Sequence, residues 1–540
     1  MDSRDGKDST QRHGGRPTLR RGPLATALPA LLVLCCLFTA AAPAGAAAPA
    51  RAAAPAWAAV PVAAPPGFSV EAFLARLALQ ETELTAGDGA SGDRFGCSVA
   101  VSGDTALVGA SRQSPWGRSG AGAAYVFVRS GGAWTAQAKL TAGDGAAGDL
   151  FGYSVALSGD TALLGAPYKT LPGKGLAVGA AYVFTRFAGS WTQQDRLIAA
   201  DGLFADQFGY SVALSGDTAL VGAPWNSAAG AVYAGAAYVF TRSAGSWAQE
   251  AKPLAGDGAA DDNFGDSVAL SGDIALVGAP DHITVGQKHL GAAYVFTRSG
   301  GAWPQEAELT AAVLPVAGWF GDSVAVSGDT ALVGAPYGAA YVFTRSGGAW
   351  PQQAMLTAAG LPEGDFGDSV ALSGDTALVG RSGTPPSITG AAYVFTRSAG
   401  SWAQQDTLTA ADGTAFDGFG DPVALSGETA LVGAEGHSTA GAADAGAAYA
   451  FRMITAPTVT QLKPASARRG ATVIISGASF GSAGTASFVK FGARKCATYP
   501  SWSDTQITCK VPAKAQYGKV SVTVTTTGGV SNAKRFTVKR

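Results

Sequence analysis

FGYSVALSGDTALVGAPWNSAAGAVYAGAAYVFTRSAGSW, from Phe208 to Trp247, is one copy of a pattern that recurs seven times in this chain. Each copy contains a run that ends in Ser-Gly-Asp or Ser-Gly-Glu, then runs like TALVGAP and GAAYVFTR, and in six copies a Trp. Runs rich in β-branched and aromatic residues between Gly and Asp breaks predict four strands per copy, named a to d in chain order. Four short strands in each long repeat predict the blades of a β-propeller. The opening Phe-Gly pairs stand at Phe95, Phe151, Phe208, Phe264, Phe320, Phe366 and Phe419.

The two ends of the array predict how it closes. The seventh copy stops at GAAYAFRM, Gly446 to Met453, without a Trp or a fourth strand. Before the first copy stands LQETELTAGDG, Leu79 to Gly89, which resembles QQDRLIAADG after the Trp of the second copy. A ring gains the closure of an exposed strand edge from this offset, whereas an open array gains nothing. We therefore predict a seven-bladed propeller over residues 79–453, with its last blade completed by the leading strand.

Composition supports an all-β class and shows an uneven charge. The chain has 540 residues, of which 74 are Gly and 14% are charged, and only four His and three Met are available for metal or redox chemistry. Residues 457–540 hold 13 Lys or Arg against one acid, a net charge of +12, while residues 47–456 hold 35 acids against 19 bases. This asymmetry predicts either attraction between the two regions or an anionic partner for the basic region.

The first 78 residues indicate a segment for export followed by a linker. Arg16, Arg20 and Arg21 precede an uncharged run and a stretch of small residues, which is typical of a signal peptide over residues 1–46. An uncleaved membrane anchor is the alternative, because the apolar run approaches spanning length. Residues 47–78 read as an Ala/Pro-rich linker followed by a short helix. We expect a secreted or cell-surface protein without a transmembrane anchor after cleavage.

The recurring FG, GAP and GAAYVF runs resemble the FG-GAP repeat family, the repeats of the integrin α-subunit propeller. Three copies depart from GAP, reading GAS at Gly109, GRS at Gly380 and GAE at Gly433. Many members of that family carry a calcium loop like DxDxDG between strands a and b, whereas this chain has only Ser-Gly-Asp there, for example at Asp104. One carboxylate cannot supply the six to eight oxygens that calcium prefers. We expect neither the family's calcium sites nor another cofactor.

A second acidic series precedes the Phe-Gly pairs at a constant spacing of five residues. Turn capping is the favoured interpretation, since Asp commonly bonds to the backbone of its own turn. Metal binding, with calcium as the possible ion, is the alternative, with Asp88, Asp93, Asp144, Asp149, Asp201 and Asp206 as ligands. The full series is Asp88/Asp93, Asp144/Asp149, Asp201/Asp206, Asp257/Asp262 and Asp412/Asp417.

The loops between strands b and c differ from copy to copy, while the other turns barely change. Variable loops on a rigid scaffold often carry function. The candidate ligand-binding residues are Trp116, Tyr168, Trp225, His282 and Tyr337. Sequence drift without function is the other interpretation of these loops.

No catalytic signature such as GxSxG, HExxH or a phosphate-binding GK[ST] is present in the sequence. The recurring Trp residues are expected to pack against neighbouring strands. We therefore expect a non-catalytic recognition or adhesion scaffold that binds an extracellular protein or polysaccharide. A secreted carbohydrate-active enzyme, either glycosidase or lyase, and a structural cell-surface protein are the alternatives.

Residues 456–540 change in composition and show short alternating strands, which predict a small antiparallel sandwich. The stretch resembles the immunoglobulin-like IPT/TIG family across nearly its full length. Because export leads to an oxidising compartment, we expect a disulfide between Cys496 and Cys509, with Cys97 as a buried free thiol. Some IPT/TIG proteins bind DNA, but export argues against nucleic acid, and the basic charge favours an anionic cell-surface polymer. The matching positions are Pro464, Gly470, Gly477, Phe480-Gly481, Phe491-Gly492, Cys496, Cys509, Pro512, Gly518 and Phe536.

Overall fold

The computed structural model describes residues 81–227, 230–283, 290–312, 318–336, 338–358, 366–383, 389–439, 441–453, 457–480, 487–503, 505–526 and 529–540. The expected signal peptide, linker and short helix lie outside these residues. Within them every regular element is a β-strand except one 3₁₀ turn, η1 (Pro115–Gly117). None of the described helical residues forms an apolar helix long enough to cross a bilayer.

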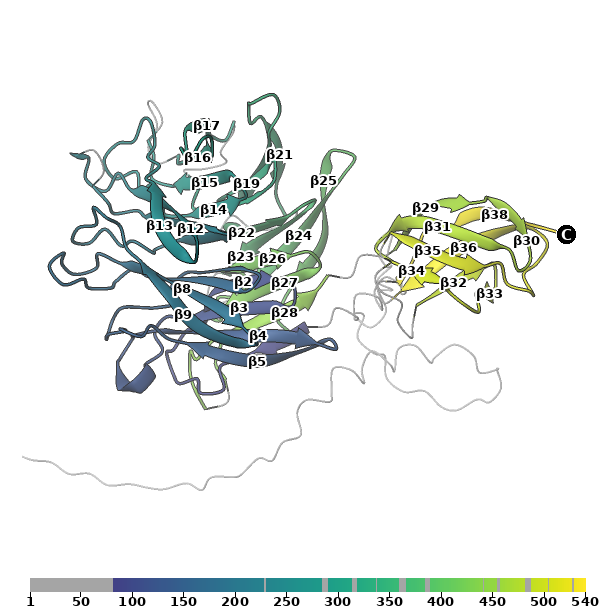
Figure 1. Ribbon diagram of the computed structural model, residues 1–540, viewed down its shortest axis with the longest axis horizontal. Coiled ribbons are helices and arrows are strands. Elements are labelled where there is room, and N and C mark those ends of the chain that lie inside the picture. The colour runs from purple at the N-terminus through teal and green to yellow at the C-terminus, as the bar shows by residue number, and fades with distance from the viewer. Residues whose placement is uncertain are drawn as a thin grey trace, which may run out of the picture. The chain divides into compact units, whose positions relative to one another are not determined.

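Seven four-stranded antiparallel sheets form the blades, and each pairs its strands in the order a-b-c-d (Figure 1). Tight Ser-Gly-Asp hairpins join strands a and b, as the sequence predicts. The a strands are β2 (Phe95–Ser102), β6 (Val155–Ser158), β10 (Val212–Ser215), β14 (Val268–Ser271), β18 (Ser323–Ser327), β22 (Phe366–Ser373) and β26 (Val423–Ser426). The b strands are β3 (Thr105–Ala110), β7 (Thr161–Ala166), β11 (Thr218–Ala223), β15 (Ile274–Ala279), β19 (Thr330–Ala335), β23 (Thr376–Arg381) and β27 (Thr429–Ala434).

Strands c and d complete each blade on its outer side. The c strands are β4 (Ala123–Ser130), β8 (Ala180–Phe187), β12 (Ala236–Ser243), β16 (Ala292–Thr297), β20 (Ala339–Thr344), β24 (Ala391–Ser398) and β28 (Ala447–Arg452). The d strands are β5 (Ala133–Leu140), β9 (Ser190–Leu197), β13 (Ser246–Ala251), β17 (Gln305–Leu309), β21 (Gln352–Leu356), β25 (Ser401–Leu408) and, for blade 7, β1 (Glu81–Leu84).

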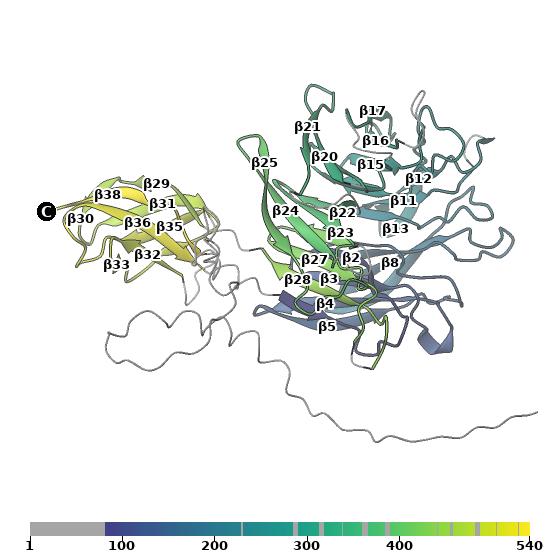
Figure 2. The same cartoon turned by 180° about the vertical axis from the view of Figure 1, so that it is seen from behind.

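The predicted closure by the leading strand is confirmed. β1 pairs antiparallel with β28, from Glu81 opposite Phe451 to Leu84 opposite Ala448, in a sheet ordered β1-β28-β27-β26. The first blade lies beside the last in both ribbon views, where purple β2 to β4 adjoin green β27 and β28 (Figures 1 and 2). The ring is therefore closed by strand pairing and not only by packing between two chain ends.

A ring of hydrogen bonds runs through all seven interfaces between blades. The Ser of each Ser-Gly hairpin accepts a hydrogen bond from the Gly backbone N–H of the next hairpin around the ring. At the closure, the backbone N–H of Gly103 in blade 1 donates to Ser426 Oγ of blade 7 at 3.1 Å. The other six pairs, written acceptor to donor, are Ser102–Gly159, Ser158–Gly216, Ser215–Gly272, Ser271–Gly328, Ser327–Gly374 and Ser373–Gly427.

The apolar core is divided among the same interfaces. Seven buried clusters each combine residues of two neighbouring blades. The cluster at the closure joins Leu84 and Leu431 of blade 7 to Phe95 and Val108 of blade 1. Burying a large apolar side chain contributes about 1.5–3 kcal/mol, so each interface between blades contributes to stability. The cluster at the closure is built from the same kinds of apolar side chain as the other six.

The Phe-Gly pairs bring neighbouring blades into close backbone contact. Phe208 packs edge-on against Tyr238 and Phe240 of its own c strand, with ring centroids 5.4 and 5.8 Å apart. Ser211, three residues after Phe208, donates from Oγ to the carbonyl of Gly265 in the next blade at 2.8 Å. The Phe-Gly-x-Ser run thus serves the contact between blades, a reason that the sequence pattern alone does not reveal.

The C-terminal residues form the predicted small sandwich of two sheets. One sheet has the order β29-β31-β35-β34, and the other β30-β38-β36-β32-β33 with β37 paired to β36. One buried cluster, which includes Ile475 and Phe536, combines side chains of both sheets. The strands are β29 (Thr458–Lys463), β30 (Ser466–Arg468), β31 (Thr472–Ala478), β32 (Phe488–Phe491), β33 (Arg494–Lys495), β34 (Ser501–Trp502), β35 (Gln506–Lys510), β36 (Gly518–Thr526), β37 (Gly529–Val530) and β38 (Lys534–Lys539).

The structure brings the two cysteines of the sandwich together as thiols. Cys496 Sγ lies 3.0 Å from Cys509 Sγ in the buried core, a contact distance and not a covalent bond. The expected disulfide therefore stays a prediction, which oxidation would satisfy with little side-chain movement. Cys97 is free, as expected, but it is only half-buried.

Candidate functional site

The hairpin face of the propeller, formed by the a–b and c–d turns, repeats one packing arrangement. In blade 1, Arg129 Nε donates to Asp104 Oδ1 at 2.8 Å, and its guanidinium lies 5.2 Å from the centre of the Trp134 ring. The prediction that the recurring Trp residues pack is confirmed by this stacking. The equivalent pairs are Arg186/Trp191, Arg242/Trp247, Arg298/Trp303 and Arg397/Trp402.

The opposite face carries the b–c loops and a polar pocket of about 560 Å³, which we call the axial pocket. It opens where the a strands begin and the b strands end, and each a strand contacts the a strand of the next blade around the ring. Arg94 Nη1 pairs with Glu435 Oε1 at 3.1 Å across the closure, and Tyr168 is 40% exposed here. Its lining is Arg94, Cys97, Ser111, Arg112, Leu150, Tyr153, Tyr168, Ser382, Gly418, Asp421 and Glu435.

The residue after each Phe-Gly pair gives the ring interior its chemistry. Burial raises the pKa of Asp266 to about 7, with a contribution from the charge of Asp281. Burial also raises the pKa of Asp322 to about 7, helped by the charges of Asp266 and Asp368. The series around the ring is Cys97, Tyr153, Tyr210, Asp266, Asp322, Asp368 and Asp421, so two successive positions are aromatic and the four after them are acidic.

Asp421 is the acidic member of this series that lines the axial pocket. Protein atoms crowd this carboxylate, and that crowding together with the charges of Asp368 and Asp322 raises its pKa to about 7. By surface area, however, Asp421 is exposed to the axial pocket. Asp322 is half-buried and its pKa is raised in the same way, so its proton is expected to affect the stability of the fold.

We expect the propeller to lose stability as the pH rises through the range set by Asp322. The unfolded carboxyl group has a pKa of 3.8 and the folded one about 7, so between these values the folded state retains a proton that the unfolded state has released. The free energy of unfolding should therefore fall by about 1–3 kcal/mol between pH 5 and pH 8 through this group. Urea unfolding at both pH values and constant ionic strength measures the change.

Asp322→Asn isolates this effect from the other titrating groups. The variant should be more stable than the parent at pH 8 and should show a smaller difference between pH 5 and pH 8. Asp261→Asn, at an exposed loop position, is the control and should leave the difference unchanged. An unaltered pH dependence in Asp322→Asn would show that this carboxylate is ionised throughout the range.

The predicted ligand-binding residues whose side chains the structure describes do not form one cluster. Tyr168 lines the axial pocket, whereas Trp225 is 41% exposed and its ring lies 6.1 Å from that of Tyr233 in the same loop. Trp116 belongs to η1, but its side chain lies outside the described residues, as does all of Tyr337. Among the three candidates with described side chains, Tyr168 is the one that lines the axial pocket.

His282 differs from its expected place on the exposed face. Its side chain is buried, with Nδ1 2.9 Å from Asp262 Oδ2 and Nε2 3.6 Å from Asp257 Oδ2. The hydrogen bond with Asp262 raises the pKa of His282 against the opposing effect of burial. His282 follows Asp262 by twenty residues, as His437 follows Asp417, and this shared spacing is the sequence signal for the pairing.

The paired aspartates before Phe-Gly have two separate roles. The second member caps its own turn, as expected: Asp93 Oδ2 accepts from the backbone N–H of Ala90 at 2.8 Å. The first member instead accepts from the Tyr of the c strand, for example Asp88 from the Tyr125 hydroxyl at 2.7 Å, a contact that sequence reasoning missed. The same Tyr contacts are made by Asp144, Asp201, Asp257 and Asp412.

In blades 1 to 3 a basic side chain of strand d neutralises the first aspartate. Lys139 Nζ lies 2.6 Å from Asp88 Oδ2, and Lys252 Nζ lies 2.6 Å from Asp201 Oδ2. Burial alone would raise the pKa of Asp88, but hydrogen bonds from Lys139 and Tyr125 more than offset it and lower that pKa. A side-chain cation thus occupies the place of a metal ion in these three blades, which argues against the alternative of metal binding by the six aspartates. Blade 2 uses Arg196 and the buried Lys169 on Asp144 and Asp149.

Comparison with known families identifies both parts of the described chain. The IPT/TIG domain model matches residues 457–538. FG-GAP repeats and IPT/TIG domains are typical of extracellular or cell-surface proteins. The FG-GAP repeat model matches residues 79–127, 134–184, 191–240, 247–296, 303–349, 350–395 and 402–451.

No curated protein matches the chain in sequence. Among solved structures, Sqt1 of Saccharomyces cerevisiae matches with a TM-score of 0.39 and 9% identity over 85% of this chain and 98% of that one. A fungal alcohol oxidase of the AA5 family, in complex with copper, matches with a TM-score of 0.42 and 13% identity over 85% and 99%. At these scores neither likeness transfers a function.

Proposed function

The chain belongs to the FG-GAP repeat family, and from that premise we propose that it is a secreted, non-catalytic recognition or adhesion scaffold. In this proposal the b–c loop face binds an extracellular ligand, with a carbohydrate chain favoured over a protein. The observation that carries it is the axial pocket, which combines the exposed ring of Tyr168 with the charged groups of Arg94, Arg112 and Glu435. Aromatic surface with a few placed polar groups is the usual lining of a small-molecule site.

The contrast between the two faces supports this assignment. On the hairpin face the recurring Arg and Trp side chains are engaged with one another, as Arg129 is with Asp104 and Trp134. On the loop face Tyr168 and Trp225 remain more than a third exposed, on loops that join strands b and c. Binding residues concentrate on loops that a rigid scaffold positions.

The basic sandwich extends the proposal to an anionic surface. Its 13 Lys and Arg against one acid would attract an anionic cell-surface polymer, with the propeller supplying selectivity. Electrostatic attraction of exposed charges weakens with added salt. Attachment of the full chain to cells should therefore weaken about tenfold or more between 50 and 500 mM salt, and salt-independent attachment would remove this part of the proposal.

A glycan array followed by calorimetry on the best ligand tests the main proposal. The double variant Tyr168→Ala/Trp225→Ala should lose about tenfold or more in affinity, as expected for two truncated aromatic contacts. Phe187→Ala is the matched control, because Phe187 is an 85% exposed aromatic residue at a c–d turn on the other face. Unchanged affinity in the double variant would contradict the assignment, and binding of a protein in place of any glycan would transfer it to the protein alternative.

The rival function, a secreted carbohydrate-active enzyme, is favoured by one observation. Asp421 lines the axial pocket with a raised pKa, the condition in which a carboxyl group can act as a general acid near neutral pH. Measuring the release of new sugar ends from each bound glycan separates the two functions. Turnover that Asp421→Asn abolishes would establish the enzyme, and binding without turnover supports the scaffold.

A further inference from the structure

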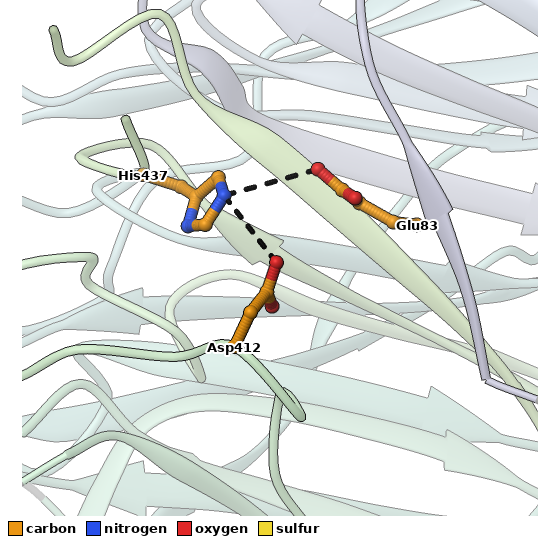
Figure 3. A group of neighbouring side chains, drawn as sticks. All are labelled: Glu83, Asp412 and His437. Carbon is orange, nitrogen blue, oxygen red and sulfur yellow. Dashed lines mark ion pairs between the residues drawn. The ribbon is translucent and has the colours of Figure 1, made fainter. Parts of the chain in front are cut away.

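Two clusters of one histidine and two carboxylates stand at equivalent places in blades 7 and 4. Blade 7 contributes Glu83, Asp412 and His437, and blade 4 contributes Asp257, His282 and Glu308; within each group the potential ligand atoms all lie within 4.8 Å of one another. Figure 3 shows the blade 7 cluster, where the His437 ring faces both carboxylates. The equivalence holds in register, because Glu83 lies opposite Tyr449 and Glu308 opposite Tyr294.

A buried aspartate orients each imidazole ring. Asp417 Oδ2 lies 2.8 Å from His437 Nδ1, and Asp262 Oδ2 lies 2.9 Å from His282 Nδ1. A carboxylate acceptor at Nδ1 keeps the proton on that nitrogen and directs the lone pair of Nε2 outward, the arrangement found behind metal-binding histidines. Both histidine residues are more than nine-tenths buried, so the orientation of their rings is fixed before any ion arrives.

The spacing around Nε2 fits a shared ion better than direct hydrogen bonds. His437 Nε2 lies 3.7 Å from Asp412 Oδ2 and 3.8 Å from Glu83 Oε1, and His282 Nε2 lies 3.6 Å from Asp257 Oδ2. These distances exceed those of a hydrogen bond. Ligands at about 2.0–2.1 Å from a tetrahedral zinc ion stand roughly 3.4 Å apart, so a small inward shift completes the geometry.

The other blades supply an internal comparison that points to a missing positive charge. In blade 3, Asp201, Asp206 and Lys252 sum to a formal charge of −1. In blade 7, the three carboxylates Glu83, Asp412 and Asp417 sum to −3. Blades 4 and 7 have Glu at the position that Lys252 occupies in blade 3, and His at the loop position of Asn226. A divalent cation in blade 7 would return the sum of formal charges to −1.

The ligand set selects the class of metal. One imidazole nitrogen and two carboxylate oxygens, with an open fourth position, suit Zn²⁺ and its neighbours, whereas Ca²⁺ prefers six to eight oxygens. A cleft of about 670 Å³, lined by Glu83, Asp412, His437 and Ser438 among others, gives the blade 7 cluster an entry path and room for a water ligand.

We propose that the His437 and His282 clusters are two Zn²⁺-class metal sites, held by Glu83/Asp412/His437 and by Asp257/Glu308/His282, with Asp417 and Asp262 as positioning residues. In blade 7 the ion joins the closing strand β1, which carries Glu83, to the loop that carries His437. In blade 4 it makes the same link between β17 and its b–c loop. The metal is a structural clamp of the loop face, independent of the ligand bound there.

Titration of the metal-free, untagged chain with Zn²⁺, in competition with a chromophoric chelator, tests the proposal. We expect two ions per chain, one ion in His437→Gln and in His282→Gln, and none in the double variant. Asp201→Asn, at the same position in lysine-bearing blade 3, is the matched control and should keep two. Asp417→Asn should weaken one site by about tenfold to a hundredfold. Binding of Co²⁺ should give the visible absorption of a tetrahedral site, a signal that misfolding would not produce.

A constructive variant guards against loss of binding through misfolding. Asn226→His combined with Lys252→Glu copies the blade 4 ligand set into blade 3 and should raise the stoichiometry from two to three. Zinc should also raise the melting temperature of the parent but not that of the double histidine variant. The proposal would be overturned if the parent bound fewer than two ions or if the histidine variants did not lower the stoichiometry. Failure of the blade 3 variant to gain an ion would also overturn it.

Discussion

Alanine in place of Gly222 is expected to lower the free energy of unfolding by about 3–5 kcal/mol, at the upper end for single substitutions. A Cβ atom there would lie 2.0 Å from the carbonyl oxygen of Gly265 in the next blade and 2.3 Å from Ser211 Oγ. The nearer of these two atoms belongs to the backbone, which cannot rotate away from the added Cβ as a flexible side chain could. Gly222 also donates its N–H to the carbonyl of Ser211 and accepts from Gly209, so it cannot move away without losing both bonds.

Two other glycines separate this clash from the general effects of adding a methyl group. Gly87 has an ordinary φ, and no atom lies within 4 Å of the place that a Cβ would occupy, so Gly87→Ala should change stability by less than about 1 kcal/mol. Gly216 has open space but a φ of +57°, so Gly216→Ala should cost about 1 kcal/mol from backbone strain alone. Equilibrium urea unfolding compares the three, and a Gly222→Ala cost no larger than that of Gly216→Ala would show that the blades can separate there.

The fold could be predicted from the sequence, whereas these contacts between blades could not. Repetition predicts four strands per unit, and the displaced strand before Phe95 predicts closure, because both are statements about order along the chain. The contact between Gly222 and Gly265, and the Ser426 to Gly103 bond across the closure, are statements about distance between blades. Such distances depend on the twist and curvature of the sheets, which no local pattern specifies.

The candidate sites were harder to predict for a related reason. His437 and Glu83 stand near opposite ends of the propeller sequence and meet only because β1 completes blade 7. The closure and the register of β1 were both needed before this pair could be noticed. The acidic positions of the ring interior can be seen in the sequence, since Asp266 and Asp322 directly follow Phe-Gly, but they are a difference between copies, whereas the repeat pattern describes only what the copies share.

Removal of residues 79–86, which include β1, is the second change with a large expected effect. The deletion takes Leu84 out of the closure cluster and exposes the edge of β28 from Ala448 to Phe451. Loss of one buried Leu costs about 2–5 kcal/mol, and each lost backbone hydrogen bond about 1 kcal/mol more. We expect the shortened chain to unfold at much lower urea concentration and to associate through the open edge, as size-exclusion chromatography with light scattering would show.

A matched pair of substitutions tests whether the closing strand is held as firmly as the others. Leu84 on β1 and Leu197 on β9 occupy equivalent positions at the ends of d strands and are 3% and 2% exposed. Leu84→Ala and Leu197→Ala should therefore destabilise the propeller equally, by about 2–5 kcal/mol each. A much smaller cost for Leu84→Ala would mean that β1 detaches readily and that the ring is open for part of the time.

Moving the strand supplies the decisive comparison. A chain in which residues 79–86 follow Arg452 through a copied c–d turn restores the a-b-c-d order of blade 7 while leaving the front of blade 1 bare. Because the ring needs the strand pairing and not the covalent position of β1, this chain should recover most of the stability lost in the deletion and remain monomeric. It should also retain the zinc site at His437, because Glu83 returns to the same register opposite Tyr449. Recovery of stability without recovery of that site would separate the closure, which the fold requires, from the metal clamp that we assign to it.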